Sequence, residues 1–394
     1  MIHAGVGQSS SESSEQAAGQ AAAAAMQQAG ISRADLAVLF LTVDHLPNYQ
    51  QIVTVLTRLC GTNRIVGSSG AGVLTGEGET EGIHGLAVLV VAASEIKGDP
   101  FLFQPVRGRD KEVGDQIASV IESHAEENSH LILFPDSYNS RPDRLFAALE
   151  NRIGFLPVVG AGSSENGALG ATYQFCNEQI STNGVAGLHL SGKFRSSVEF
   201  TQGCQPITAP MVITKAERNL IYEIDHRPAF EVFSGVIKGP LSEDLRRALT
   251  LVFVGLPADR NQRNLTPGNY LVRNIIGLDP AKGILGISEE VREGLPIVFT
   301  VRDPQRARED LNQMLQRQAA NLEGRSPTFG FYFNCCARGS SLYGMPGLDT
   351  AYIRQSLGQF PLIGLFGGFE LAPLSRKNHL LAYTGVLVLI SDAG

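Results

Sequence analysis

Apolar and polar positions follow the same order in three segments of the chain. Each segment opens with an apolar run, continues with polar residues and a stretch of helical character, and returns to a second short apolar run. Short apolar runs bounded by polar residues are typical of buried strands. The opening runs span residues 36–43, 131–134 and 329–333, and the helical stretches span residues 49–59, 142–152 and 350–357. The pattern predicts three strand–helix–strand units.

A pair of glycines marks the same point in every copy. The first ends the helix, as glycine commonly does, and the second follows six positions later, behind two apolar residues. The pairs are Gly61 and Gly67, Gly154 and Gly160, and Gly358 and Gly364. We assign the second glycine to the carboxyl end of the returning strand. A further apolar run (residues 86–91, 185–190 and 386–390) closes each copy, and the spacing predicts parallel pairing of the first two strands with a right-handed crossover.

The rest of the chain has other patterns. Residues 9–14 form a serine-rich stretch that we expect to be a flexible lead-in, and the alanine-rich residues 16–29 predict a helix. The middle of the chain predicts hairpins at 209–225 and 270–287, a short helix at 228–236, a strand at 297–301 and a helix from 303 to about 322. We therefore predict a mixed α/β fold of repeated β-α-β units with extra antiparallel strands and a two-half architecture. The expected domains are residues 1–30 (lead-in and helix), 31–226 and 227–394.

Composition narrows the function classes. The chain has 394 residues, 43% of them apolar, and a formal net charge of −7. Without a concentrated basic patch, neither nucleic acid nor an anionic membrane is an expected partner. Five scattered cysteines, no run of ~18 apolar residues and no secretory leader indicate a reducing, cytoplasmic setting. Because zinc-ligand spacing and phosphate-binding loops are both missing from the sequence, we expect no metal and no cofactor.

Polar residues follow the predicted strands, where ligands gather in open parallel sheets. Tight turns that bind no ligand are the alternative explanation. The candidates after the first strands are Asp44, His45, Asp136, Asn139, Asn334, Cys335 and Arg338, and those in the glycine-rich loops are Ser68, Ser69, Ser163, Ser164, Glu165 and Glu370.

Arg338 and the adjacent cysteines are the most reactive-looking group. An arginine at a strand end can grip a carboxylate with two parallel bonds, or it can form an internal salt bridge with Glu370 or Asp349. Strand alternation sends Cys335 and Cys336 to opposite faces, so that one packs inside and the other can face a cleft. A catalytic thiol would need a base, and the sequence places none beside either cysteine. With no catalytic motif found, we do not expect an enzyme.

Several motifs in order resemble FIST domain proteins over roughly residues 30 to 392. In the N-terminal part they are IVGSSGAG at 65–72 and EGIHGLAVL at 81–89, and in the C-terminal part YLVRNII at 270–276, FNCCARG at 333–339 and PLIGLF at 361–366, followed by ELAP at 370–373. One departure is Phe369, where the family usually has glycine, and a bulky ring there could narrow a cleft.

The resemblance implies a FIST N-terminal domain, a FIST C-terminal domain and a stand-alone sensory protein. Its expected ligand is an amino acid or a related carboxylate, bound between the two halves, and its signal would pass to an unknown partner protein. Arg338 would hold the carboxylate, and Glu370 or an aspartate the amino group. An enzyme with a reactive Cys335 or Cys336 and a protein-interaction scaffold are the alternatives.

Overall fold

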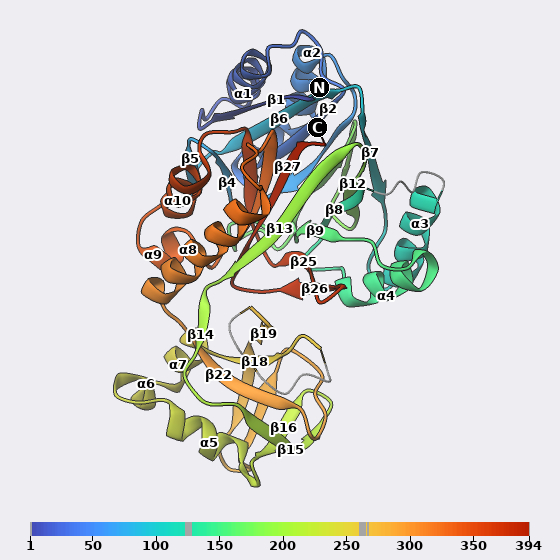
Figure 1. Ribbon diagram of the computed structural model, residues 1–394. Helices are drawn as coiled ribbons and strands as arrows, with labels where there is room; N and C mark the ends of the chain where they lie inside the picture. The colour runs from blue at the N-terminus through green and yellow to red at the C-terminus, as the bar shows by residue number, and fades with distance from the viewer. Residues whose placement is uncertain (1, 123–127, 260–264, 266–267, 394) are drawn as a thin grey trace. The chain divides into compact units, whose positions relative to one another are not determined.

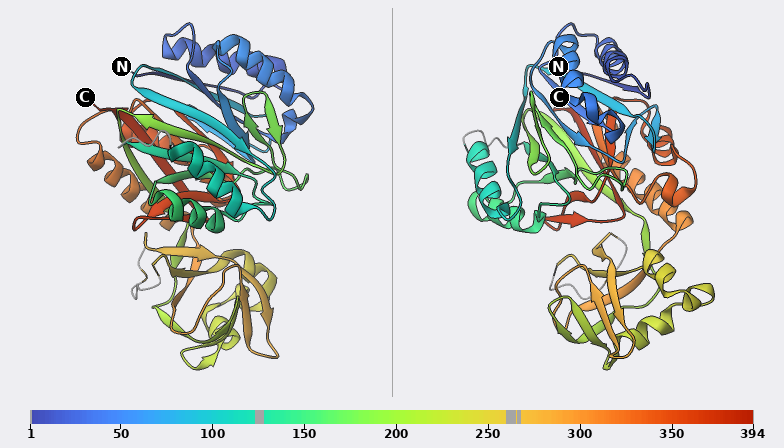
Figure 2. Two further views of the ribbon diagram at one scale, coloured as in Figure 1. Left: turned by 90° about the vertical axis from the view of Figure 1, so that its right-hand side faces the viewer. Right: turned by 180° about the vertical axis from the view of Figure 1, so that it is seen from behind.

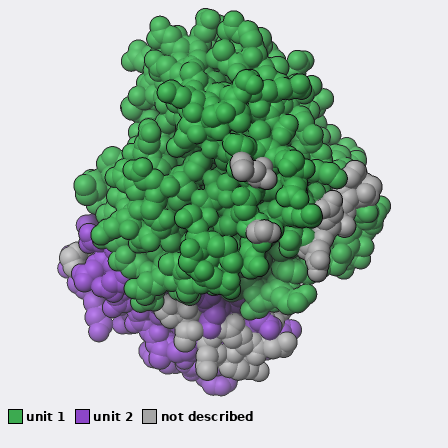
Figure 3. Space-filling model, turned by 45° about the horizontal axis from the view of Figure 1, so that its top comes forward, with its two compact units in different colours: residues 1–200, 311–380, 384–394 green, residues 201–310, 381–383 purple. Residues whose placement is uncertain are grey.

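The computed structural model describes residues 2–122, 128–259, 265 and 268–393. The chain forms two compact units, coloured separately in Figure 3: unit 1 comprises residues 1–200, 311–380 and 384–394, and unit 2 comprises residues 201–310 and 381–383. The sequence predicted a domain boundary at residue 226, which lies inside unit 2. The compact units differ from that prediction because the chain leaves unit 1 near residue 200 and returns to it at residue 311.

Unit 1 contains three six-stranded sheets built to one plan (Figure 1). In each sheet the closing strand of a copy pairs antiparallel with the opening strand, which pairs parallel with the returning strand. This confirms the predicted mixed α/β class and the parallel strand pairs. The first sheet has the order β1 (Ile2–Ser9), β6 (Leu86–Ala93), β2 (Leu36–Leu41), β3 (Ile65–Ser69), β10 (Gln174–Cys176), β11 (Gln179–Ser181). The second has β26 (Lys377–Leu381), β25 (Glu370–Leu374), β9 (Val158–Ala161), β8 (Ser129–Pro135), β12 (Val185–Gly192), β7 (Ile96–Phe103). The third has β13 (Phe194–Gln202), β27 (Thr384–Asp392), β23 (Phe329–Cys335), β24 (Leu362–Gly367), β4 (Gly72–Thr75), β5 (Gly78–Glu81).

The copies exchange hairpins in a cycle. The hairpin β4–β5 of the first copy joins β24 of the third, β10–β11 of the second joins β3 of the first, and the β25–β26 pair of the third joins β9 of the second. Each copy therefore completes the sheet of another, and no copy has its full sheet alone.

Helices cover the outer face of each sheet (Figure 2). Helices α1 (Ser14–Ala29) and α2 (Tyr49–Cys60) pack together against the first sheet, and α3 (Asp110–Glu122) and α4 (Pro142–Ile153) against the second. Helices α8 (Pro304–Asn321) and α10 (Leu348–Leu357) contribute to the core of the third, next to the short α9 (Ser340–Tyr343). A 3-10 helix, η1 (Val43–Asn48), precedes α2.

Three phenylalanines meet where the copies converge. Phe40, Phe134 and Phe333 occupy the same position in the three opening strands, and their ring centroids lie 5.2, 6.0 and 6.5 Å apart. All three side chains are fully buried. The repeat seen in the sequence is therefore a threefold pseudosymmetry of unit 1, with an aromatic core at its centre.

The second glycine of each repeated pair lies inside its strand, so the predicted position at the carboxyl end was wrong. Gly67, Gly160 and Gly364 are register partners of residues 39, 133 and 332 on the neighbouring parallel strand. A Cβ at these glycines would lie only 1.7, 2.0 and 1.9 Å from the carbonyl oxygen of that partner. Glycine recurs because any side chain would push apart the two central strands of each sheet.

The amino-terminal stretch is ordered, and the predicted flexible lead-in was wrong. β1 pairs antiparallel with β6 over its full length. Ser13 caps α1 by accepting a hydrogen bond from the backbone N–H of Gln16, and Ser14 is buried. A Cβ at Gly5 would lie 2.1 Å from the carbonyl oxygen of Ala25, so β1 and α1 approach closely.

Unit 2 is inserted into the third copy, between β13 and α8. Its strands are β14 (Cys204–Pro206), β15 (Met211–Glu217), β16 (Leu220–Ile224), β17 (Arg227–Pro228), β18 (Val252–Pro257), β19 (Tyr270–Arg273), β20 (Ile275–Asp279), β21 (Ile284–Ile287) and β22 (Pro296–Arg302), and its helices are α5 (Ala229–Val236), α6 (Pro240–Glu243) and α7 (Leu245–Leu251). The hairpin predicted at 270–287 is shorter, because only β20 and β21 form it and β19 pairs with β18.

Candidate functional site

The glycine-rich loops of unit 1 are tied together by a closed ring of main-chain hydrogen bonds. The N–H of Ser164 donates to the carbonyl oxygen of Ser69, the N–H of Gly368 to that of Gly162, and the N–H of Ala71 to that of Phe366. The N···O distance is 3.0 Å in each case. Donor and acceptor occupy equivalent positions in all three copies. The loops that we predicted to bind a ligand therefore bind one another.

The four predicted loop serines are all buried in this ring. The Ser69 hydroxyl donates to the carbonyl oxygen of Ser164, that of Ser164 to the carbonyl oxygen of Phe366, and that of Ser68 to the carbonyl oxygen of Ser69. Among the described residues, the Ser163 hydroxyl has no hydrogen-bond partner. The turn interpretation, which the sequence left open, accounts for three of the four.

Asp136 and Asn139 also lie at this ring. The carboxylate of Asp136 accepts hydrogen bonds from the Tyr138 N–H at 2.9 Å, the Asn139 amide at 2.6 Å and the Thr172 hydroxyl at 3.1 Å. These bonds hold the turn after β8. Asp44 is exposed in η1 and is not part of this cluster.

The third copy contains a fully buried ion pair, which Arg338, after the end of β23, forms with Asp349 of α10. Arg338 donates to the Asp349 carboxylate from Nε at 3.1 Å and from Nη2 at 3.1 and 3.2 Å. Tyr332 and Asn334 donate to the same carboxylate at 2.9 and 3.2 Å, and Nη2 of Arg338 also donates to the Tyr343 hydroxyl at 2.8 Å. Burial alone would lower the pKa of Arg338, but the Asp349 carboxylate raises it above its usual range. The arginine stays charged, and Asp349 neutralises it.

Glu370 lies near this pair but is not bonded to it. Its Oε2 accepts hydrogen bonds from the Thr384 hydroxyl at 2.6 Å and the Thr384 N–H at 3.2 Å. Burial, with a further contribution from Cys335, raises the pKa of Glu370 well above its usual range, which favours the neutral form of the carboxyl group. Within the described part of the chain, Oε1 of Glu370, Nη1 of Arg338 and Oδ1 of Asn334 have no hydrogen-bond partner.

Two glutamates of β5 hold helices of the third copy, and neither was predicted from the sequence. Glu79 accepts hydrogen bonds from the N–H groups of Gly347 at 2.7 Å and Thr350 at 3.2 Å, at the start of α10. Glu81 accepts from the N–H and hydroxyl of Ser340, both at 3.0 Å, at the start of α9. Burial, and then Asp349, raise the pKa of Glu79 to about 7. A hairpin of the first copy thus positions the helix that carries Asp349.

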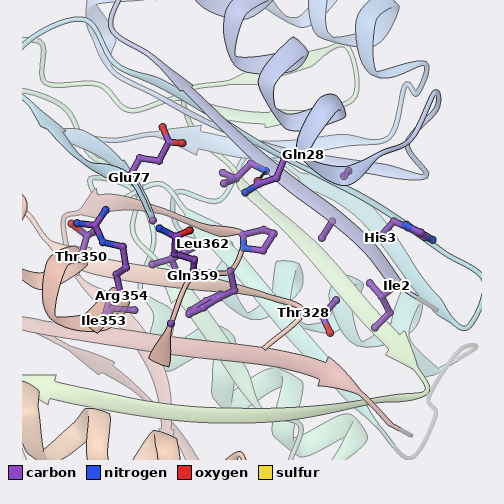
Figure 4. Close-up of a pocket in the computed structure, with 17 residues that line it drawn as sticks. Ile2, His3, Gln28, Glu77, Thr328, Thr350, Ile353, Arg354, Gln359 and Leu362 are labelled. Carbon is purple, nitrogen blue, oxygen red and sulfur yellow. Dashed lines mark hydrogen bonds between the residues drawn. The ribbon is translucent and has the colours of Figure 1, made fainter. Parts of the chain in front are cut away.

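A cavity of about 490 Å³ opens beside α10 (Figure 4). Its walls come from both halves of the sequence: β1 and the end of α1 on one side, and α10 with the chain before β24 on the other. Arg354 and Glu77 supply the charges, and Ile353, Phe360 and Leu362 supply apolar surface. In the view of Figure 4, Arg354, Thr350 and Glu77 lie toward one side, and Ile2 and His3 toward the other. None of the ligand-binding residues predicted from the sequence lines this cavity.

The side chains of Arg354 and Glu77 form no ion pair or hydrogen bond within the described residues. Both side chains are exposed. Arg354 lies in the last turn of α10, where a basic residue is ordinary. The sequence carried no signal for this site, since β1, which forms one wall, was predicted to be part of a lead-in.

Two family models match the chain in succession. The FIST N domain matches residues 35–227, and the FIST C domain matches residues 229–373. The chain belongs to the FIST family. This confirms the resemblance, and FIST domains are generally implicated in sensing small ligands in signalling.

Two relatives match this FIST protein over nearly its whole length, and a third matches about half of it. It is 29% identical to an uncharacterized protein of Mycobacterium tuberculosis, over 98% of this chain and 99% of that one, and 29% identical to one of Mycobacterium bovis, over 98% of both. An uncharacterized protein of Methanocaldococcus jannaschii is 20% identical over 55% of this chain and 46% of that one. Among solved structures, a cyanuric acid hydrolase from A. caulinodans has 14% identity and a TM-score of 0.29, over 49% of this chain and 70% of that one.

The FIST motifs lie mainly in the packed parts of unit 1. Phe369, the departure from the family pattern, packs into the core beneath the second sheet, where its ring occupies the space beside Gly162. Cys335 is buried and Cys336 is exposed, which agrees with strand alternation. The described residues contain no cluster that could hold a metal ion, and none of their helices is long and apolar enough to cross a membrane.

Proposed function

We propose that this FIST protein is a cytoplasmic sensory protein that binds an amino acid or a related carboxylate and signals through a partner protein. The cavity beside α10 carries the proposal, because it presents a cation and an anion, both unpaired in the described part of the chain, together with apolar surface. A free amino acid offers the complementary carboxylate, ammonium and side chain. A volume of about 490 Å³ falls within the range of roughly 300–1,000 Å³ typical of small-molecule sites.

Arg354 is better placed than Arg338 to receive a carboxylate. Arg338 is fully buried and its charge is neutralised by Asp349, so a second carboxylate there would have to displace the first. The Arg354 guanidinium is exposed to the cavity and unpaired within the described ranges, and it can form two parallel bonds with a carboxylate. We therefore assign the carboxylate to Arg354 and the ammonium group to Glu77. The Arg338 network supports the site by holding α10.

A binding protein, not an enzyme, is the function this arrangement favours. The lining residues include no cysteine, no serine and no paired carboxylates, and the candidate nucleophiles Cys335 and Cys336 lie outside it. Charge complementarity and shape suffice for recognition, whereas nucleophilic catalysis needs a nucleophile with an adjacent base.

A thermal-shift screen against amino acids and carboxylate metabolites tests the proposal. A ligand present at 100 times its dissociation constant adds about 2.7 kcal/mol to the stability of the folded state, which raises the melting temperature measurably. We expect a hit whose shift disappears in Arg354→Gln. Arg58→Gln is the matched control, because Arg58 is an exposed basic residue in the last turn of α2, the corresponding helix of the first copy. A hit equally affected by both variants, or no hit, would contradict the proposal.

A further inference from the structure

β1 presents an open backbone edge to the cavity. It is the outermost strand of the first sheet, and among the residues that the structure describes it pairs only with β6. The N–H of Val6 donates to the side-chain amide oxygen of Gln28 at 2.7 Å, so it points away from β6. In an antiparallel pair, outward- and inward-facing residues alternate. The regular register of β1 therefore turns the N–H and C=O groups of Ile2 and Ala4 outward as well.

Three outward-facing residues of β1 line the cavity, and so does His3, which lies between two of them. Ile2, Ala4 and Val6 all belong to its wall. The Val6 N–H is hydrogen-bonded to Gln28, whereas the outward main-chain groups of Ile2 and Ala4 have no partner in the part of the chain that the structure describes. An unpaired strand edge is a template for another extended chain. The wall thus offers a second kind of recognition, by main-chain hydrogen bonds, which a free amino acid cannot use fully.

We infer that the cavity takes the carboxyl terminus of an extended peptide, which adds to β1 as a short strand and places its terminal carboxylate on Arg354. The inference rests on the proposed function, since it uses the same cavity and the same arginine. Main-chain bonds to a sheet edge supply affinity in this mode of recognition, and side-chain pockets supply specificity. Phe360, which is partly exposed and lines the cavity, offers apolar surface to the peptide's side chains.

The length of the peptide follows from the strand edge. Ile2 and Ala4 are two residues apart, which corresponds to about 6.6 Å along a strand. About three residues are needed to pair with both and still extend a carboxylate beyond them. The Arg354 guanidinium, which has no partner among the described residues, matches the negative terminus, and Glu77 disfavours a second carboxylate nearby.

Binding of N-acetyl-trialanine, measured by calorimetry, tests the inference. We expect the peptide with a free carboxylate to bind, and its C-terminal amide to bind at least tenfold more weakly. N-methylation of each amide in turn removes one donor, and we expect at least one methylated peptide to lose tenfold or more. Free alanine and the amino acids of the thermal-shift screen are measured in parallel.

Ala4→Pro tests the main-chain hydrogen bond from the protein side, because it removes the N–H of Ala4. Proline is tolerated on an edge strand where its missing N–H faces outward, so we expect the variant to fold and to lose tenfold or more in peptide affinity. If it does not fold, the methylated peptides still decide. Equal binding of all methylated peptides, or an unaffected Ala4→Pro, overturns the strand pairing. If amino acids bind and no peptide binds, this inference is overturned and the proposed function stands. If neither amino acids nor peptides bind, both are overturned.

Discussion

Nη2 of Arg338 lies 3.1 Å from Oδ2 of Asp349, and neither side chain is exposed to solvent. Asp349 belongs to α10, which also carries Arg354 of the cavity, and the start of α10 is held by Glu79 from the first copy. The ion pair and the glutamate therefore fix, from two directions, the helix that forms one wall of the proposed site. The effect of removing the ion pair or Glu79 can be measured as a change in the free energy of unfolding, without any ligand.

Asp349→Asn is expected to destabilise unit 1 by about 3–5 kcal/mol, because it leaves the Arg338 charge buried without a counter-ion. Denaturant unfolding measures the loss. The matched control is Glu112→Gln, which breaks the exposed pair between Arg109 and Glu112 and should cost less than about 1 kcal/mol. The double variant Arg338→Met with Asp349→Leu removes both charges and should recover part of the loss. An Asp349→Asn effect no larger than the control would contradict the role assigned to the pair.

Alanine at the second glycine of any copy should disrupt its sheet. A Cβ at Gly67, Gly160 or Gly364 would lie within 2.0 Å of a main-chain carbonyl oxygen that cannot rotate away. We expect each variant to be destabilised by more than about 3 kcal/mol or to fail to fold, as overpacking in cores does at its worst. Gly19→Ala is the control, because Gly19 is in α1 with nothing within 4 Å of the added Cβ. It should stabilise the protein by up to about 1 kcal/mol, and equal effects at the two kinds of site would rule out the close approach.

Glu79 should make stability depend on pH. Its pKa is raised from 4.5 to about 7 in the folded state, so between these values the folded protein binds a proton that the unfolded chain does not. Stability therefore falls as pH rises from about 4.5 to 7, by roughly 3 kcal/mol for a shift of this size. Glu79→Gln should remove this dependence.

The measurement is the difference between wild-type and Glu79→Gln unfolding free energies across that pH range. A difference is needed because His45, whose pKa is lowered to about 4 by burial and by His84, changes stability in the opposite direction between pH 4 and 6.5. Glu12→Gln, at an exposed position, should follow the wild type throughout. A flat difference curve for Glu79→Gln would show that its carboxyl group titrates normally.

The central strands and helices of unit 1 could be predicted because their signals are local. α4 was expected at 142–152 and spans Pro142–Ile153, since proline at its start and an apolar stripe specify it. β5 could not be predicted. Its sequence, Gly-Glu-Thr-Glu, has no apolar alternation, and it forms a strand because β4 pairs with it and its glutamates cap helices more than 250 residues away.

The site was harder to predict than the fold. Arg338 stood out because it follows a buried strand, and of its two possible acidic partners the structure selects Asp349. Arg354 was overlooked, since a charged residue in the last turn of an exposed helix carries no signal of function. The loop serines had the opposite problem: glycine and serine after a strand suit ligand loops and interlocking loops equally, and only contacts between copies distinguish the two.

Cys336 should be the only thiol that reacts in the folded protein. Of the five cysteines, Cys336 is exposed, whereas Cys60, Cys176, Cys204 and Cys335 are buried. Burial also raises the pKa of Cys60 and Cys176 to about 11, which disfavours the reactive thiolate. A mild electrophile at neutral pH should therefore label one thiol per folded chain and five after denaturation, and Cys336→Ser should abolish the folded-state reaction. A folded-state rate close to that of the denatured chain would identify Cys336 as an ordinary surface thiol. A much faster rate, or labelling at Cys335, would instead revive the thiol enzyme as an alternative to the binding protein proposed above.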